Sequence, residues 1–505
     1  MPIEFPLLSS ILIISLLGSL LIYLFPAREK GTKLFAILIS FLPLALSSVL
    51  VIGIVAPHIV ELTSVPAGGQ EFLAYEKADW IPQAGISFEF GVDQLSGPLV
   101  FLTSLLTTLG MIFSWGEKHR TREFFAVLLF MEGTIVGVFA SLDLFLFFIF
   151  WEGGLLPMYF LIAIWGGPNR RYASIKFFLY TQAASLLVLL GILVFYWMSE
   201  PRSFSMIDMI DNPPVPLGLY TNLLFFALLL GFGTKLPMVP LHTWLPDAHV
   251  EAPTAGSVLL AGVLLKMGGY GLIRFNVQML PGVVESLYML VAVIGVVSII
   301  YGAFVCLAQD DLKRLVAFSS VSHMGFVMLG IAAAVLKGSN LAMTGAIFQL
   351  FAHGLISAAL FMIAGALGHN VGTRLISRLR GAAKRIPNTA GFMMVAFMAS
   401  LGLPGLVGFV AEFSVFLGVY QSFGLWVLIP AVSVIITAGY YLYAMQRAMF
   451  GPEKEDMGEM KDLHSFEIVS LSVLVVFIAL LGILPFILFD PIANWVSALG
   501  LGGLP

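Results

Sequence analysis

The segment LLFFALLLGFGTKLPM, residues 223–238, carries no charged side chain except Lys235 and lies inside a longer apolar run at 219–241. The hydrocarbon core of a bilayer is about 30 Å thick, and a helix needs about 20 predominantly apolar residues to cross it. The run therefore predicts a membrane-spanning helix that holds an ammonium group at membrane depth. Because an isolated charge there is costly, Lys235 is expected to have a partner or water beside it.

Thirteen further runs have the same length and composition, so the predicted fold is an all-α polytopic membrane protein with fourteen transmembrane helices. The other predicted spans are residues 7–25, 34–55, 97–115, 124–142, 144–165, 173–198, 256–275, 286–308, 315–335, 342–368, 390–420, 425–450 and 467–489. We expect one large helical bundle instead of several compact water-soluble domains.

The composition of the whole chain agrees with a membrane protein. Of its 505 residues, 59% are hydrophobic and 11% are charged, whereas soluble domains average about 45–50% and about 25%. A formal net charge of −4 is too small and too balanced for a nucleic-acid-binding surface. The single cysteine, Cys306, excludes a disulfide within the chain, an iron–sulfur cluster with four thiolates of its own, and a cysteine-rich zinc site.

Basic residues alternate between the predicted loops as the positive-inside rule requires. If both termini face the outer compartment, the odd-numbered loops contain nineteen Lys and Arg residues, five of them between Arg374 and Arg385. The even-numbered loops and the termini are assigned only Lys77, Arg202, Arg274 and Lys337. This partition predicts fourteen spans with both termini outside, because losing one helix would scramble the alternation after it.

Seven ionisable residues lie within predicted spans and not at their edges. They are Glu132, Glu152, Lys235, Lys266, His323, His353 and Glu412. Any one of them could be a structural polar group satisfied by a neighbouring helix, but Ser, Thr or Asn would hold helices together at lower cost. Burial moves the proton affinities of Lys, His and Glu toward neutral pH, whereas Arg keeps its proton. The choice of residues therefore predicts a proton relay along side chains and bridging water.

Two predicted spans contain helix-breaking residues beside a buried charge. The breaking residues are Pro237, Pro240, Pro404 and Gly405. The first two follow Lys235 and the last two precede Glu412. Proline removes a helical hydrogen bond, and non-helical backbone at membrane depth is tolerated only where protein or water satisfies it. We expect the breaks to line hydrated cavities, although a packing kink would explain either break alone.

The two breaks fall in the seventh and twelfth spans, five helices apart. This offset predicts two structural repeats, and the odd number of helices in each makes the second repeat inverted in the membrane. The predicted organisation is helices 1 to 3 in residues 1–120, a first repeat of helices 4 to 8 in 121–280, a second of helices 9 to 13 in 281–455, and helix 14 in 456–505.

Motifs for nucleotide binding and electron transfer are absent from the sequence. It contains no GxGxxG dinucleotide fingerprint, no GxxxxGK[ST] phosphate loop and no CxxC pair. We therefore expect no cofactor and no metal on this chain. Any work against a gradient must be driven by ion flow or by a partner protein.

Four segments of the sequence resemble the antiporter-like proton-pumping subunits of respiratory complex I. They are FFIFWEGGLLPMYFLIAIWGG (147–167), KLPMVPLHTWLPDAHVEAPTAGSVLLAGVLLKMGGYG (235–271), LKRLVAFSSVSHMGFVMLG (312–330) and LPGLVGFVAEF (403–413). The resemblance extends over nearly the whole chain. Among these subunits the chain is most similar to subunit M, also called chain 4. It lacks the long lateral helix of subunit L, and Glu412 stands where subunits L and N and the Mrp antiporter subunits usually have lysine.

The resemblance implies a role for each matching position. Glu152 and Lys235 match the family's charged pair in helices 5 and 7, in which the carboxylate tunes the lysine. Lys266 matches the central lysine of helix 8, and Glu412 matches the terminal group from which the proton leaves. The family fold, fourteen helices with two inverted five-helix repeats, agrees with the number obtained from the loops.

The remaining polar positions are assigned more loosely. His323 and His353 match polar links of the family's central hydrated axis, and Glu132 is treated as an uptake-side or coupling residue. His242 and His249 could belong to a proton uptake route or could be structural caps beneath the broken seventh helix, and we favour the structural role slightly.

The resemblance also implies partners and a location. We expect other membrane subunits of a complex I-like assembly, a peripheral redox arm carrying flavin and iron–sulfur clusters, and a multi-pass position in a bacterial or archaeal plasma membrane or a thylakoid. Two other functions stay open at this point: an Mrp-type cation/proton antiporter subunit, and a non-transporting membrane scaffold of a redox complex.

Overall fold

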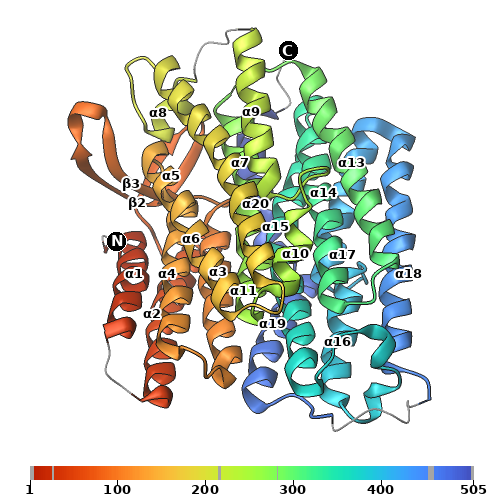
Figure 1. Cartoon of the computed structure of the whole chain (residues 1–505). Coiled ribbons are helices and arrows are strands. Elements are labelled where there is room, and N and C mark those ends of the chain that lie inside the picture. Colours follow the sequence, from red (N-terminus) through yellow and green to blue (C-terminus); the bar gives the residue numbers. More distant parts are fainter. Residues whose placement is uncertain (1–4, 25–27, 214–217, 281, 453–459, 502–505) are drawn as a thin grey trace.

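The computed structural model describes residues 5–24, 28–213, 218–280, 282–452 and 460–501. Most helices run roughly parallel to one another, and a small sheet lies toward one end of the bundle (Figure 1). The first helices are α1 (Leu7–Leu24), α2 (Glu29–Val55), α3 (Gly97–Phe113), α4 (Thr121–Ala140), α5 (Leu144–Gly153), α6 (Leu155–Trp165), α7 (Arg170–Met198), α8 (Met206–Asp211), α9 (Leu219–Lys235) and α10 (Trp244–Glu251). The later helices are α11 (Thr254–Leu259), α12 (Leu265–Gly271), α13 (Glu285–Leu307), α14 (Leu312–Lys337), α15 (Asn340–Ala366), α16 (Pro387–Ser400), α17 (Val407–Phe423), α18 (Leu428–Met449), α19 (Ser465–Ile483) and α20 (Phe486–Ala498).

Twelve helical segments within the described residues are long and apolar enough to cross a membrane. Two differences separate this number from the predicted fourteen. The seventh predicted span contains the 17-residue helix α9, which ends at Lys235, and the segment Val407–Met449 joins α17 to α18 through a short 3₁₀ turn. A polytopic helical membrane protein is therefore supported, and the number fourteen stays a prediction.

A three-stranded antiparallel sheet between α2 and α3 was not predicted by the all-α assignment. Its strands are β1 (Ser64–Ala67), β2 (Gln70–Ile81) and β3 (Ile86–Val92), in the order β1-β2-β3. Along β2, Gln70, Phe72 and Ala74 are buried while Glu71 is exposed, which is the period-two pattern of a half-buried strand. A search for runs of about 20 apolar residues passes over such short alternating segments.

The centre of the bundle is formed by three segments, each of which contains an 18-residue apolar stretch that is wholly buried. They are Thr254–Gln278, Leu312–Lys337 and Asn340–Val371. The first combines α11 and α12 with two π-helical stretches, η3 (Leu260–Leu264) and η4 (Leu272–Gln278). Because π-helical turns are rare and concentrate at functional sites, this central helix is a natural place to look for function.

Two short backbone bridges have the same pattern in the two halves of the chain. In the first half, Leu144 N donates to Phe204 O and Met206 N donates to Leu142 O. In the second half, Leu312 N donates to Arg374 O and Ile376 N donates to Asp310 O. Asp143 lies between the bonded residues Leu142 and Leu144 and also caps α5. Asp311 lies between Asp310 and Leu312 and caps α14 in the same way.

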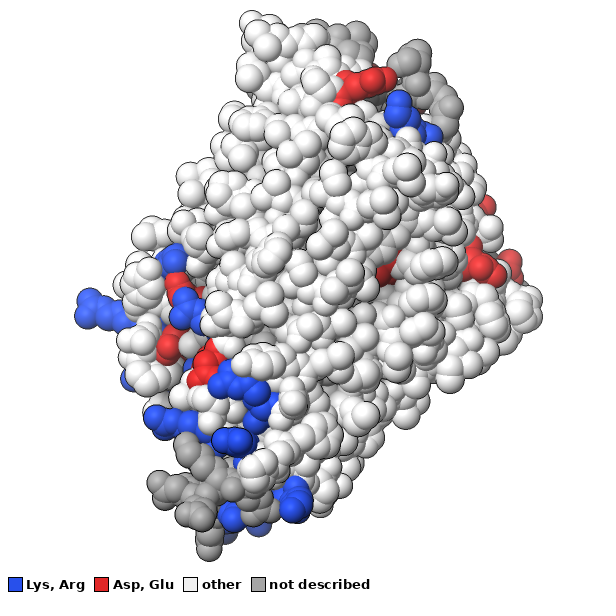
Figure 2. Space-filling view, turned by 90° about the vertical axis from the view of Figure 1, so that its right-hand side faces the viewer, with Lys and Arg blue, Asp and Glu red and all other residues white. Residues whose placement is uncertain are grey.

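The two ends of the bundle differ in charge. We call the end that carries β1–β3 and α8 the sheet end, and the end that carries α16 and the loop 374–385 the basic end (Figure 1). In Figure 2 most of the visible Lys and Arg side chains gather toward the basic end. Arg374 and Arg447 form ion pairs there with Asp311 and Asp310, respectively.

Candidate functional site

Four of the predicted residues lie in a buried row across the centre of the molecule, which we call the buried chain. Lys266 Nζ, on α12, lies 2.7 Å from His353 Nδ1, on α15. The His353 ring centroid lies 5.5 Å from that of His323, on α14, and His323 Nδ1 lies 2.8 Å from Glu412 Oε1, on α17. All four residues are buried. Their order runs from the central helix to the second broken region through side chains that can bind and release protons.

Lys235 and Glu152 lie to one side of this chain. Lys235 is the last residue of α9 and is buried, and its Nζ lies 4.2 Å from the centre of the Trp151 ring. Trp151 Nε1 donates to Ser185 Oγ at 2.9 Å, which holds the ring in place. Glu152 is the carboxylate that interacts electrostatically with Lys235. The aromatic face favours the ammonium form of Lys235.

The backbone after Lys235 is not helical, and other groups satisfy it. Met238 N donates to Gly233 O at 2.8 Å, and Val239 N donates to Ser298 Oγ at 3.1 Å. Trp244 Nε1 donates to Thr234 O at 3.0 Å, which ties the start of α10 to the end of α9. The structure places Pro237 and Pro240 in this connection, where non-helical backbone needs such partners.

The second break lies beside Glu412. The structure places Pro404 and Gly405 between α16 and α17, and Gly402 and Gly405 both adopt positive φ angles, 80° and 89°. A Cβ atom on Gly402 would lie 3.4 Å from Glu412 Oε2. Glycine permits the turn at these positive φ angles, and a Cβ on Gly402 would be in ordinary van der Waals contact with the carboxylate.

No hydrogen bond among the described residues joins Lys235 to Lys266. The helices are close, since a Cβ on Gly268 of α12 would lie 2.5 Å from Phe232 O of α9. A relay from Lys235 to Lys266 therefore needs a water molecule or a side-chain movement between them.

Hydroxyl groups that were not predicted extend the chain toward the basic end. His323 Nε2 lies 3.1 Å from Ser400 Oγ, which donates to Tyr441 Oη at 2.7 Å. Tyr441 Oη in turn donates to Ser319 Oγ at 3.0 Å. Sequence reasoning missed this branch because single Ser and Tyr residues in apolar helices are common and carry no spacing signal.

Glu132 and His242, two of the loosely assigned residues, lie apart from the buried chain. The Glu132 carboxylate is fully buried in α4 and faces the hydroxyls of Ser15 and Ser104. His242 packs against Tyr301, with 5.0 Å between ring centroids. None of these contacts involves the buried chain, so the roles of Glu132 and His242 stay predictions.

His249 occupies a position closer to the buried chain. It stacks on Phe361 at 4.2 Å, and neither ring nitrogen has a hydrogen-bond partner among the described residues. A positive charge on its ring would be repelled by Lys313 and Lys266. This placement is compatible with both the uptake role and the structural role.

One assignment from the sequence is wrong. Arg274 was placed in an outer loop, but it lies in the membrane-length segment Thr254–Gln278 and is fully buried. Its Nη2 forms an ion pair with Asp93 Oδ2 at 2.6 Å, and both side chains are inaccessible to solvent. The error arose because the predicted span ended at residue 275, next to Arg274, and because Asp93, its partner, precedes the third predicted span.

No group of three or more His, Cys, Asp or Glu residues within the described part of the chain could hold a metal ion.

Outside the membrane-length helices, burial raises the pKa of Asp143 although three backbone N–H groups stabilise its carboxylate. This residue caps α5 and is not part of the buried chain.

Comparison with known proteins identifies the family. Residues 141–437 match the family described as NADH:quinone oxidoreductase/Mrp antiporter, transmembrane. The chain is 43% identical over 428 residues to F(420)H(2) dehydrogenase subunit M of Methanosarcina mazei, covering 83% of this chain and 85% of that protein. It is 42% identical over 465 residues to NAD(P)H-quinone oxidoreductase chain 4 1 of Synechococcus elongatus, covering 90% of this chain and 84% of that protein.

A solved structure agrees with these relatives. A chain of respiratory complex I from Thermus thermophilus with bound NADH superposes with a TM-score of 0.86 at 28% identity, covering 98% of this chain and 100% of that one. The resemblance predicted from the sequence is thereby confirmed. The chain is an integral multi-pass membrane protein that belongs to the NADH:quinone oxidoreductase/Mrp antiporter family, and its relatives in that family include subunit M and chain 4 proteins.

Proposed function

We propose that this chain translocates protons across the membrane as the subunit M-like component of a complex I-type redox-driven pump. The observation that carries this proposal is the buried chain Lys266–His353–His323–Glu412, in which neighbouring groups are joined by contacts of 2.7 and 2.8 Å and by one ring pair. Each member can change its protonation state, and such intramembrane groups typically mark a proton path.

The proposed mechanism uses charge as the signal. When Glu152 lies near Lys235, Coulomb attraction favours the ammonium form of the lysine. When the two move apart the ammonium form loses that support, and a charged Lys266 disfavours it further by repulsion. Once Lys266 has given up its own proton and is neutral, the Lys235 proton passes to it. The proton then follows His353 and His323 to Glu412.

The proposed topology has fourteen spans in two inverted repeats, residues 121–280 and 281–455, flanked by helices 1 to 3 in 1–120 and helix 14 in 456–505. The matching backbone bridges at Asp143 and Asp311 support it, since they lie at comparable positions of the two repeats. The sheet end would face outside with both termini, and the basic end would face inside, as the positive-inside rule favours.

The proposed partners are the neighbouring antiporter-like subunits of the same complex and its peripheral redox arm. Electrons would pass through flavin and iron–sulfur clusters on those partners to a quinone-type acceptor, and this chain would carry no redox group. The location would be a bacterial or archaeal plasma membrane or a thylakoid membrane. Named subunits of quinone oxidoreductases among the relatives support this assignment.

The test of the proposed function is Lys235→Ala in the assembled complex. Acidification of inside-out membrane vesicles, driven by the complex's own electron donor, is expected to fall about a hundredfold, the size typical of losing a positioned proton-transfer group. Lys30→Ala is the matched control, because Lys30 is exposed at the start of α2. Full acidification by a correctly assembled Lys235→Ala complex would refute proton translocation by this chain.

Transport assays on the same vesicles distinguish the proposed function from an Mrp-type antiporter and from a non-transporting scaffold. Exchange of Na⁺ or K⁺ for protons without an electron donor would assign the chain to the Mrp-type antiporters. Normal pumping after neutral replacement of every member of the buried chain would indicate a scaffold.

Tyr441→Phe tests the branch of hydroxyl groups formed by Ser400, Tyr441 and Ser319. The adjacent Tyr440 provides its control. The change removes only the oxygen that bridges Ser400 and Ser319, and a net hydrogen bond of ~1 kcal/mol corresponds to about a fivefold loss of pumping rate. The neighbouring Tyr440 is equally buried, and among the described residues no hydrogen bond joins its hydroxyl to Ser400 or Ser319. We expect Tyr440→Phe to pump at the unmodified rate, and equal effects of both variants would exclude a specific role for the branch.

A further inference from the structure

His323 contacts both halves of the second broken helix. Its Nε2 lies 3.1 Å from Oγ of Ser400, the last residue of α16. Its Nδ1 lies 2.8 Å from Oε1 of Glu412, on α17. The imidazole therefore bridges the break with one ring nitrogen on each side. The hydrogen bond made by one ring nitrogen decides whether the other carries the proton, so the contact with Ser400 bears on the contact with Glu412.

The hydroxyl branch formed by Ser400, Tyr441 and Ser319 ends on a backbone carbonyl. Ser400 Oγ donates to Tyr441 Oη at 2.7 Å, and Tyr441 Oη donates to Ser319 Oγ at 3.0 Å. Ser319 Oγ donates to Val316 O, in the same helix, at 2.9 Å. A carbonyl oxygen can only accept hydrogen bonds. The far end of the branch is therefore held by an acceptor.

This carbonyl sets the direction of every hydrogen bond in the branch. A hydroxyl group has one proton to donate. Ser319 gives its proton to Val316 O, so it accepts from Tyr441. Tyr441 in turn accepts from Ser400. Ser400 then has no proton left for the imidazole, so Nε2 of His323 is the donor in their contact. Reversing the branch would leave the bond from Ser319 to the carbonyl unmade.

Nδ1 is then the ring nitrogen that can exchange a proton with Glu412. A neutral imidazole with its proton on Nε2 presents a lone pair at Nδ1. The 2.8 Å contact with Glu412 Oε1 lies off the direction of a regular hydrogen bond, and no other group within the described part of the chain bonds to Nδ1. A lone pair and a carboxylate repel each other at this distance. The contact therefore needs one proton, held either by Nδ1 or by the carboxyl group.

We propose that the hydroxyl branch sets the tautomer of His323, so that the imidazole receives each proton on Nδ1 and passes it to Glu412. The proposal rests on the proposed function and adds to it the reason why the last transfer leads to the carboxylate. The three residues of the branch are positioning residues, which act through the imidazole. The branch itself does not conduct protons, because the carbonyl at its end cannot pass one on.

The proton transfers balance without any other reactant. A proton arriving from the side of His353 binds Nδ1, which gives an imidazolium beside the Glu412 carboxylate. The proton then moves to Oε1, which leaves a neutral imidazole and a carboxylic acid. Its departure to water restores the carboxylate, and Nε2 keeps its own proton throughout. The lone pair at Nδ1 again faces a carboxylate, and their repulsion favours uptake of the next proton.

Three ionisable groups approach this imidazole from other helices. Glu412 lies on α17, and Tyr441 on α18 is linked through Ser400. His353 lies on α15, with 5.5 Å between the two ring centroids, and Lys266 lies 2.7 Å beyond it. A positive charge on His353 or Lys266 repels a proton on Nδ1. Charging the earlier members of the buried chain therefore pushes the proton onto the carboxylate.

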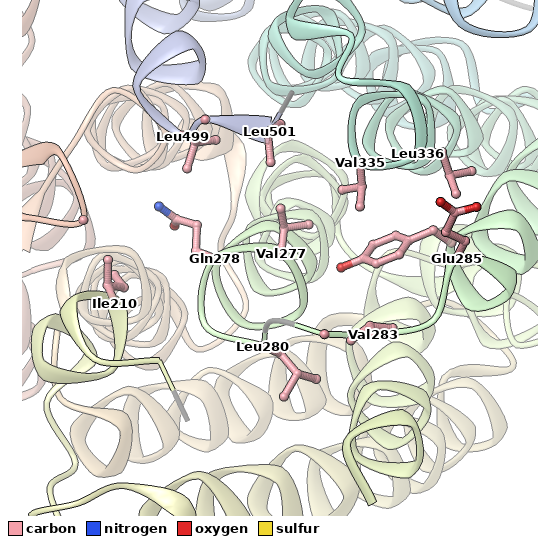
Figure 3. Close-up of a pocket in the computed structure, with 14 residues that line it drawn as sticks. Ile210, Val277, Gln278, Leu280, Val283, Glu285, Val335, Leu336, Leu499 and Leu501 are labelled. Carbon is pink, nitrogen blue, oxygen red and sulfur yellow. The ribbon is translucent and has the colours of Figure 1, made fainter. Parts of the chain in front are cut away.

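The cavity at the sheet end takes no direct part in this transfer. It has a volume of about 490 Å³, and Figure 3 shows Gln278 and Glu285 on opposite sides of it. Its lining includes no member of the buried chain and none of the hydroxyl branch. The contacts around His323 thus leave the carboxylate of Glu412 as the group that receives its proton.

Ser319 is the most informative residue to change, because it lies two hydrogen bonds away from Ser400 and does not touch the buried chain. In Ser319→Ala the Tyr441 hydroxyl is free to donate to Ser400, and Ser400 is free to donate to Nε2. The imidazole proton then moves to Nδ1. Ser320→Ala is a matched control, because Ser320 is equally buried and also donates to Val316 O, at 3.1 Å, but lies outside the branch. Ser319→Thr keeps the hydroxyl.

The experiment measures the pH dependence of pumping by assembled complexes in inside-out vesicles, relative to donor oxidation. With its proton on Nδ1 the imidazole already donates to the carboxylate, so the pair takes up a further proton less readily. We expect the pH at which pumping falls by half, as the pH is raised, to be about 0.7 unit lower in Ser319→Ala, which corresponds to a fivefold loss of proton affinity. Ser320→Ala and Ser319→Thr should keep the unmodified value. An unshifted pH dependence in Ser319→Ala, or an equal shift in Ser320→Ala, would overturn the proposal.

Nitrogen-15 NMR of the complex labelled in histidine reads the tautomer without relying on pumping. The signals of His323 are assigned by their loss in His323→Asn. We expect Nε2 to be protonated in the unmodified complex and in Ser320→Ala, and a bare Nε2 to appear in Ser319→Ala. A bare Nε2 in the unmodified complex would refute the assigned tautomer.

Glu412→Gln separates failure of this proposal from failure of the proposed function. If Glu412→Gln stops pumping while Ser319→Ala behaves like Ser320→Ala, the role of the hydroxyl branch is wrong and proton translocation stands. If Glu412→Gln pumps normally, the carboxylate does not receive the proton, and both the last step of the proposed function and the role of the branch are wrong.

Discussion

Proton translocation is expected to fall about a hundredfold or more when Glu412 is replaced by glutamine. The carboxylate lies 2.8 Å from His323 Nδ1 and is the last titratable member of the buried chain. Glutamine preserves the size of the side chain and a polar contact with the imidazole but cannot bind a proton. Acidification of inside-out vesicles, compared with donor oxidation by the same preparation, measures the effect.

The control for this change is Glu71→Gln. Glu71 is exposed in β2, so its neutralisation should leave assembly and pumping unchanged. If Glu412→Gln pumps like Glu71→Gln, the buried carboxylate is dispensable and the terminal role assigned to it is wrong.

Loss of the assembled complex is the expected result of Arg274→Ala. The change strands the Asp93 carboxylate in a fully buried site, and breaking one side of a buried ion pair typically costs ~3–5 kcal/mol. That cost is a large fraction of the stability of a typical protein domain, about 5–15 kcal/mol. The yield and thermal stability of the purified complex would show the loss.

Arg120→Ala provides the comparison for stability. Arg120 pairs with Glu123 at 3.6 Å on the surface, and both side chains are at least one-third exposed. Such pairs contribute about 0–1 kcal/mol, so this variant should be as stable as the unmodified chain. A stable Arg274→Ala complex would mean that water or another group compensates Asp93.

Long apolar helices were the most predictable part of the fold. The spans around α2, α7 and α13 follow from length and composition, because the bilayer sets the number of residues needed to cross it. The three-stranded sheet was missed because its alternating segments are shorter than a membrane span. The exact ends of α9 and α17 were missed because the breaks beside Lys235 and Glu412 shorten these helices.

Single charged residues in apolar runs were predictable candidates, but their contacts were not. The sequence could not show that Lys266 meets His353 or that His323 meets Glu412, because these pairs join helices far apart in the chain. Arg274 was assigned to a loop because the sequence does not show its contact with Asp93, which is also far away in the chain. The four-residue spacing from Lys266 through Tyr270 to Gln278 was visible in the sequence, and it would have placed Arg274 on the face of the same helix.

The most direct test of a proton path through this chain is a cryo-electron microscopy map of the assembled complex at a resolution that shows ordered water. We expect water between Lys235 and Lys266, where no hydrogen bond among the described residues connects the two, and further water between His353 and His323. A dry, apolar separation at both places, with the amines and imidazoles bonded only to backbone carbonyls, would contradict a continuous relay.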